Sequence, residues 1–175
     1  MKIAIGGIAG AGKDYLIKGL TDFTRVAFAD ELKKECSRIF PWLKEDYKPF
    51  EKEQPIKNGF TPRQIWLDIA QVLRSIDDKI FIDKLEEHVK TLQGTNIVIS
   101  DVRTKDEFIW CKENGFVCIF IEPSNYLYEP NAYDEQLFEF KDYFDHCFVN
   151  GFNGIQDQNN FKLLLNTLNK DINAN

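Results

Sequence analysis

A glycine-rich stretch that ends in a lysine lies near the N-terminus, and its residue types suit phosphate chemistry. Residues 7–13 read Gly-Ile-Ala-Gly-Ala-Gly-Lys, which fits the pattern G-x-x-x-x-G-K, and they follow an apolar run at residues 3–5. Between a strand and a helix, glycines let successive backbone N–H groups face phosphate oxygens, and the lysine adds a positive charge. The stretch predicts a site for nucleoside triphosphate phosphates. Its expected contacts are Gly7, Ala9, Gly10, Ala11, Gly12, Lys13 and Asp14.

Asp14 stands where such loops usually carry a serine or threonine that ligates Mg²⁺. A carboxylate can also hold Mg²⁺, directly or through a bound water, because this cation prefers oxygen ligands. An acid in the first turn of a helix also complements the helix dipole. Asp14 is therefore a candidate metal ligand, and the alternative is a purely capping role.

A second polar pair follows the apolar residues of the stretch IVISDVR, at 97–103. Asp101 comes at the carboxyl end of an expected buried strand, which is where α/β proteins bind ligands. We expect Asp101 to bind Mg²⁺ or its waters and Arg103 to face phosphate. Both could be ordinary loop residues, but a phosphate loop in the same chain favours the functional interpretation. Glu107 is assigned to a capping box with Thr104.

Apolar runs alternate with helical patterns along the chain. Strands are expected at 3–5, 26–29, 96–100, 115–121 and 146–150, and helices at 13–20, 30–40, 61–76, 78–92, 104–115 and 160–169. The third helix begins with a capping box, Thr61 to Gln64, and continues with an apolar stripe that includes Val72 and Ile76. This order predicts an α/β fold, a three-layer sandwich around a parallel sheet.

The composition narrows the functional class. The 175 residues are 43% hydrophobic, with a net charge of −6, so a packed domain is expected and a general nucleic-acid binder is not. The four cysteines are widely separated and there are only two histidines, which indicates reduced thiols and neither a zinc site nor a disulfide framework. No segment is apolar for long enough to span a membrane, so a cytoplasmic location is expected.

Four stretches in sequence carry a family resemblance: GKD at 12–14, FADELKK at 28–34, TPRQIWLDIAQVLRSIDDKIF at 61–81, and ISDVRTKDE at 99–107. Together they resemble the deoxynucleoside monophosphate kinases of bacteriophages, within the P-loop nucleoside monophosphate kinases whose loop ends in GKD. The resemblance implies a five-stranded parallel sheet of order 2-3-1-4-5. It also implies transfer of the γ-phosphoryl group of ATP, with Mg²⁺, to a (deoxy)nucleoside monophosphate. A monomer or homodimer is expected, in the host cytoplasm if the protein is phage-encoded.

The resemblance also places acceptor residues on this sequence. Asp30 and Lys33 would face the acceptor nucleotide, and Arg63 and Arg74 would lie on its binding helix. Arg103, in the DVR stretch at 101–103, would also contact the acceptor. The two arginines are eleven residues apart, about three helical turns, so both can lie on one face. A guanidinium holds phosphate oxygens with two parallel hydrogen bonds. The alternative for each residue is a solvated side chain or a local ion pair.

By the same resemblance, residues 1–175 form a single kinase domain. Its core would be 1–29 and 93–175, its acceptor-binding insertion about 30–92, and its lid about 122–135. Kinases of this group typically use basic lid residues, yet residues 122–135 contain no Lys or Arg. Catalytic charge would then come from Lys13 and Arg103, with Lys105 or Arg74 as further candidates, unless the lid lies elsewhere in the chain. Tyr126, Tyr128 and Tyr133 could contact adenine.

Two other functions stay open. The same loop would serve a kinase for another small phosphorylated metabolite, such as phosphomevalonate or dephospho-coenzyme A. A nucleotide-binding regulatory module that has lost turnover is the third possibility, and the absence of basic residues in the expected lid is compatible with it.

Overall fold

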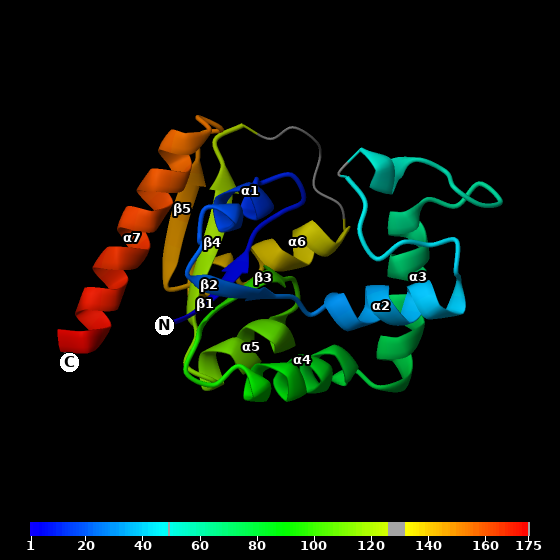
Figure 1. Ribbon diagram of the computed structural model, residues 1–175, viewed down its shortest axis with the longest axis horizontal. Coiled ribbons are helices and arrows are strands. Elements are labelled where there is room, and N and C mark those ends of the chain that lie inside the picture. Colours follow the sequence, from blue (N-terminus) through cyan, green and yellow to red (C-terminus); the bar gives the residue numbers. More distant parts are fainter. Residues whose placement is uncertain (49, 126–131, 175) are drawn as a thin grey trace. The chain divides into compact units, whose positions relative to one another are not determined.

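The chain forms two compact units in a computed structural model, which describes residues 1–48, 50–125 and 132–174. One unit comprises Met1–Ala27 and Leu92–Asn175, and the other is Phe28–Thr91. The first unit contains a parallel sheet and the second is built of helices (Figure 1).

The sheet has five parallel strands. They are β1 (Lys2–Gly6), β2 (Phe23–Val26), β3 (Asn96–Val102), β4 (Val117–Pro123) and β5 (His146–Asn150). Their order is β2-β3-β1-β4-β5, which confirms the predicted topology. In the central strand, Ala4 pairs with Ile99 on one side and with Cys118 on the other. Ile3, Ala4 and Ile5 are fully buried, as expected for a strand covered on both faces.

Helices cover both faces of this sheet, which confirms the three-layer sandwich. Alternate side chains of a strand point to opposite faces, so Ile119 and Ile121 lie on one side and Phe120 on the other. The first face packs against α1 (Lys13–Lys18) and α7 (Ile155–Ala174) through a mainly aliphatic core that includes Leu16 and Leu165, together with the ring of Phe161. The second face carries a cluster of phenylalanines. They come from β4, from α5 (Lys105–Glu113), from α6 (Ala132–Phe138) and from the segment around the short η2 helix (Lys141–Tyr143): Phe108, Phe120, Phe138, Phe140 and Phe144.

The helical unit contains α2 (Asp30–Ile39), the short η1 helix (Glu51–Glu53), α3 (Pro62–Ile76) and α4 (Ile80–Thr91). The Thr61 side chain caps α3 by accepting from the Gln64 N–H, as predicted. The Gln64 side chain does not complete the capping box, because it donates to Asp68 one turn further on, at 2.7 Å.

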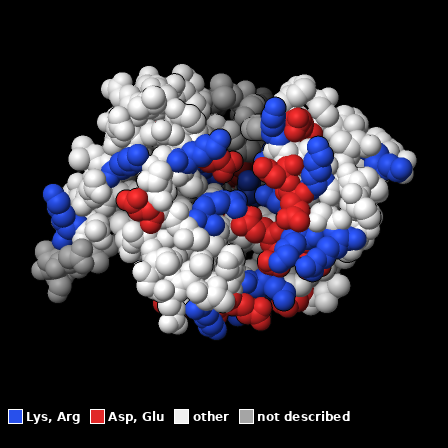
Figure 2. Space-filling model, in the orientation of Figure 1, with Lys and Arg blue, Asp and Glu red and all other residues white. Residues whose placement is uncertain are grey.

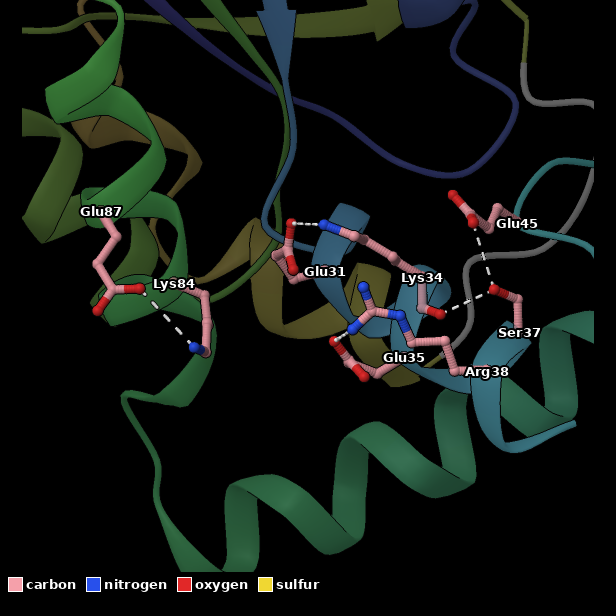
Figure 3. Close-up of polar contacts among 8 residues, drawn as sticks. All are labelled: Glu31, Lys34, Glu35, Ser37, Arg38, Glu45, Lys84 and Glu87. Carbon is pink, nitrogen blue, oxygen red and sulfur yellow. Dashed lines mark hydrogen bonds and ion pairs between the residues drawn. The ribbon is translucent and has the colours of Figure 1, made fainter.

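Exposed ion pairs lie on the surface of the helical unit (Figure 3). On α2, Lys34 lies 3.3 Å from Glu31 and Arg38 lies 2.6 Å from Glu35, each pair three residues apart. Such exposed pairs contribute at most about 1 kcal/mol each to stability. These pairs lie on the surface of α2.

Several element boundaries differ from the prediction. β2 spans Phe23–Val26 instead of 26–29, because it is an edge strand paired only with β3 and its Thr24 and Arg25 are exposed. α7 begins at Ile155 rather than 160 and continues to Ala174, and α6 is a helix that the sequence pattern did not predict. In α3, Val72 and Ile76 of the predicted apolar stripe are 59% and 80% exposed.

The described residues contain neither a helix that could span a membrane nor a disulfide bond. No helix among them is long and apolar enough to cross a membrane. The four cysteines are free thiols, three of them buried, and burial raises their pKa values. The chain therefore presents no activated thiol at these three positions.

Candidate functional site

The stretch between β1 and α1 forms a tight loop, and the surrounding structure explains why two of its positions are glycine. Gly7 has φ +142°, and a Cβ atom there would lie 2.5 Å from the backbone oxygen of Ile121 on β4. Gly12 has φ +79° and caps α1, and a Cβ there would lie 2.2 Å from the Asn150 side chain. A side chain at either position would collide with its neighbours, so glycine is required for this loop geometry.

Lys13 turns its ammonium group back across the loop. Its Nζ donates to the backbone oxygens of Gly7 at 2.6 Å and Ile8 at 2.8 Å. Burial of the ammonium, and next the Arg103 guanidinium, lower the pKa of Lys13 to about 7, against the opposite effect of nearby carboxylates. An anionic ligand at this point would therefore stabilise the charged lysine.

The predicted residues of the phosphate site gather around this lysine. Asp14, Asp101 and Arg103 all act electrostatically on Lys13, and so does Asp134, which the sequence reasoning did not single out. Asp101 lies within β3, at its carboxyl end, and Arg103 follows the strand directly. The structure thus brings together residues from the carboxyl end of β3, from the first turn of α1 and from α6.

A capping box fixes the backbone at Arg103. The N–H groups of Arg103 and Thr104 donate to the Glu107 carboxylate at 2.8 Å and 3.1 Å, and the Thr104 hydroxyl accepts from the Glu107 N–H. The role predicted for Glu107 is therefore confirmed. Within the described part of the chain, the Arg103 guanidinium makes no hydrogen bond or ion pair, which leaves it available to an anion.

The two candidate metal ligands suit a magnesium ion bound together with a nucleotide. Asp14 is exposed and Asp101 is half-buried. No group of three or more His, Cys, Asp or Glu side chains among the described residues could hold a metal ion by itself. Mg²⁺ commonly keeps several waters and is bound through one or two carboxylates together with phosphate oxygens. Two carboxylates beside a phosphate loop meet that requirement.

Two residues that contact the loop were not predicted from the sequence. Asn150, at the end of β5, donates to the Ala11 oxygen at 2.9 Å and accepts from the Phe152 N–H at 3.2 Å. Asp134, on α6, accepts from the Ala9 N–H at 3.1 Å. Both are 2% exposed. A polar residue that closes an apolar strand could have identified Asn150, whereas no local pattern marks Asp134.

Four of the five candidate acceptor residues lie in the Phe28–Thr91 unit, and the fifth, Arg103, belongs to the other unit. Lys33 Nζ is 5.5 Å from the centre of the Trp66 ring, and the Arg74 guanidinium is 4.8 Å from that of Phe81. Arg63 forms an ion pair with Glu53 of η1. Asp30 is the first residue of α2. Trp66 and Phe81 are 7% and 5% exposed, so both pack in the core, as expected for apolar patterns.

The expected lid, 122–135, is only partly described. It includes the end of β4 and the start of α6, while Tyr126 and Tyr128 lie outside the described residues. Tyr133 belongs to α6, but its side chain is likewise outside the description. The predicted adenine contacts therefore stay predictions.

Charged side chains of both signs are intermingled over the helices of the Phe28–Thr91 unit, on the face shown in Figure 2. A nucleic-acid-binding face would instead carry a continuous basic stripe. The face in view has the mixed character of an ordinary solvated surface.

Comparison with known proteins identifies structures with a similar fold but assigns the chain to no family. No protein-family model matches the sequence, and no curated protein sequence matches it. Among solved structures, dephospho-CoA kinase from Campylobacter jejuni is similar over 98% of this chain and 99% of its own, with a TM-score of 0.57 and 14% identity. A protein from Thermus thermophilus is similar over 96% and 97%, with a TM-score of 0.50 and 14% identity. At this level of identity the similarity shows the fold alone, and the fold is shared with the Campylobacter jejuni kinase.

Proposed function

We propose that this protein is an ATP-dependent kinase that transfers the γ-phosphoryl group to a (deoxy)nucleoside monophosphate, with the diphosphate and ADP as products. The observation that carries the proposal is the position of Lys13. Its ammonium is held against the Gly7 and Ile8 oxygens, inside a glycine-dependent loop, with Arg103 and two candidate magnesium ligands around it. This is the arrangement that phosphoryl transfer requires, since the chemistry depends on positioning and on charge stabilisation.

Each residue of the loop region has a role in this proposal. The N–H groups of residues 7–14 would hold the triphosphate, and Lys13 with Arg103 would stabilise the negative charge of the transferring group. Asp14 and Asp101 would hold Mg²⁺ or its waters, and the cation would neutralise charge on the β- and γ-phosphates. The fixed backbone at Arg103 supports this, because a positioned guanidinium stabilises charge without first having to reorganise.

The family resemblance assigns the acceptor to residues of the helical unit and to Arg103. Lys33, Arg63 and Arg74 would bind its phosphate, with Asp30 contacting the nucleotide. An aromatic ring beside Lys33 and another beside Arg74 limit the freedom of these two cations, which favours a binding role. Arg63 would have to exchange Glu53 for the acceptor phosphate.

Dephospho-coenzyme A is the second candidate acceptor. It is favoured by the similarity in fold, over nearly the full length of both chains, to the Campylobacter jejuni dephospho-CoA kinase. The four motif stretches favour the nucleoside monophosphate instead, and we rank that acceptor first.

An assay that follows ADP distinguishes the candidates. The protein is incubated with Mg·ATP and one acceptor at a time: dAMP, dGMP, dTMP, dCMP, the ribonucleotides, dephospho-coenzyme A and phosphomevalonate. ADP formation with a nucleoside monophosphate supports the first proposal, and formation only with a metabolite replaces it by the second. ATP binding without turnover on any acceptor would indicate a regulatory module.

Lys13→Ala tests the mechanism within the same assay. Loss of a charge that acts on the transferring group should lower turnover by at least about 100-fold. Lys18→Ala is the matched control, because Lys18 is an exposed lysine in the last turn of the same helix and should be replaceable without loss of activity. Undiminished turnover in a folded Lys13→Ala protein rejects the mechanism.

A further inference from the structure

A carboxylate occupies one of the hydrogen-bond donors that the phosphate loop offers to a nucleotide. Asp134 Oδ1 accepts from the backbone N–H of Ala9 at 3.1 Å, although the two residues are 125 positions apart in the chain. Asp134 is 2% exposed and lies on α6. Ala9 stands in the middle of the loop, among the residues expected to surround the phosphates.

This contact has the chemistry of a phosphate contact. A carboxylate oxygen and a phosphate oxygen are both anionic acceptors, and each forms a strong, charge-assisted bond with a backbone N–H. The Asp134 carboxylate also acts on the Lys13 ammonium in the direction a phosphate would, by favouring its charged form. The loop therefore already holds an anion, which the protein itself supplies.

A bound triphosphate and the Asp134 carboxylate would compete for this position. The Ala9 N–H has one hydrogen to donate, so it cannot make a good bond to both acceptors. Two anions that share one half-buried amide also repel each other, and partial burial makes this repulsion stronger than it is in water. One of the two has to leave.

We propose that Asp134 is an internal competitor that occupies the nucleotide-free phosphate loop and is displaced from the Ala9 N–H when ATP binds. The inference rests on the proposed function only in that the loop binds ATP. Displacement requires a rotation of the side chain or a shift in the first turn of α6. Without nucleotide, the Asp134 carboxylate keeps the loop ordered and offsets the positive charge of Lys13. It weakens ATP binding by the free energy of the hydrogen bond that must be broken.

Removing the charge of Asp134 tests the proposal. Asp134→Asn keeps the shape of the side chain and an acceptor oxygen but removes the negative charge. Dissociation constants for Mg·ATP are measured by calorimetry, without acceptor. The variant should bind ATP about tenfold more tightly than the wild type, because the competing bond is no longer charge-assisted.

Glu135→Gln is the matched control. It removes one negative charge from the next position of the same helix, where the side chain is exposed, and its ATP affinity should stay within about twofold of the wild type. If Asp134→Asn does not fold, Asp134→Ser is measured instead, and the same tighter binding is expected. Unchanged or weaker ATP binding in a folded Asp134 variant overturns the proposal and makes Asp134 a structural brace or a part of the binding site.

Hydrogen exchange supplies a second readout. In the wild type, amides of residues 132–138 should exchange faster after Mg·ATP is added, because α6 loses its bond to the loop. Slower exchange there would contradict displacement. A wild type that does not bind ATP refutes both this inference and the proposed function, whereas ATP binding without turnover on any acceptor refutes the kinase proposal alone.

Discussion

Lys13 combines a charge with a poorly hydrated position. Its ammonium has two backbone oxygens as partners at 2.6 Å and 2.8 Å, but burial and the Arg103 guanidinium still lower its pKa to about 7 from an ordinary 10.5. The folded protein without ligand therefore holds this proton less firmly than the unfolded chain. Such a group makes folding stability depend on pH.

The lowered pKa of Lys13 predicts that the contribution of this residue to the free energy of unfolding increases as pH rises. Between about pH 7 and pH 10.5 the unfolded chain binds more protons at this position than the folded protein, so the free energy of unfolding increases with pH. Below pH 7 both states hold the proton and the contribution is constant. Lys13→Met removes this dependence.

Urea unfolding at pH 7, 8, 9 and 10, without nucleotide or divalent cation, measures the effect. The difference between the wild type and Lys13→Met isolates residue 13, because the other titrating groups are common to both proteins. The wild type should gain stability relative to the variant at each step. Parallel curves would show that the ammonium is as well hydrated in the folded protein as in the unfolded chain.

The residues of the site differ in how well the sequence predicts them. Gly7, Gly12 and Lys13 follow from a contiguous pattern whose physical meaning is local, and the structure gives reasons for both glycines. Asp134 contacts the loop from 125 residues away, across a tertiary contact that no spacing in the sequence encodes. Asn150 is intermediate, because its position at the end of a strand is visible but its bond to Ala11 is not.

At the scale of elements, the junction between β1 and α1 depends on its packing against β4. Gly7 lies so close to the Ile121 backbone that a Cβ would be 2.5 Å from its oxygen. That oxygen belongs to a buried strand paired with β1 and β5, so it cannot move aside without disturbing the sheet. The phosphate loop is therefore held in place by the sheet itself.

Gly7→Ala should destabilise the protein and abolish ATP binding. Gly115→Ala is the matched control, because Gly115 also has a positive φ, +74°, but no atom lies within 4 Å of its added Cβ. The control should cost about 1 kcal/mol from backbone strain alone. Gly7→Ala should cost about 1–3 kcal/mol more, from overpacking. Thermal unfolding and ATP calorimetry measure both effects, and equal losses in the two variants would count against a tightly packed loop.

The sequence predicts central elements better than edge elements. β1 is buried on both faces and reads as an unbroken apolar run, which locates it well. β2 is an edge strand whose exposed Thr24 and Arg25 break that pattern, so the apolar run predicts a strand at 26–29 although β2 ends at Val26. The first turns of α7 are polar and make local contacts, such as Asp157 with the Asn153 N–H at 2.7 Å, and apolar periodicity cannot detect them.

At the scale of the whole molecule, the proposed tasks are divided between the two compact units. The phosphate loop, Asp101 and Arg103 belong to Met1–Ala27 and Leu92–Asn175, whereas Lys33, Arg63 and Arg74 belong to Phe28–Thr91. If each unit binds its own ligand, a substitution in the helical unit should weaken binding of the acceptor and leave the affinity for ATP unchanged. A substitution in the loop should do the reverse.

Lys33→Met tests this division with a neighbouring control. Lys33 lies over the Trp66 ring, whereas Lys34, the next residue, pairs with Glu31 at 3.3 Å on the surface of α2. Lys33→Met should raise the KM for the acceptor about tenfold or more, which is the worth of one charge-assisted hydrogen bond. Its dissociation constant for ATP should stay within about twofold of the wild type. Lys34→Met should change neither quantity.

The pair of measurements separates a binding role from a structural one. Methionine keeps the length and apolar stem of lysine, so packing on Trp66 is largely preserved and the unit should remain folded. Loss of stability without a change in the acceptor KM would make Lys33 a structural partner of Trp66. A parallel loss of acceptor and ATP affinity would show that the two ligands share residues across the units, and the division of tasks would be wrong.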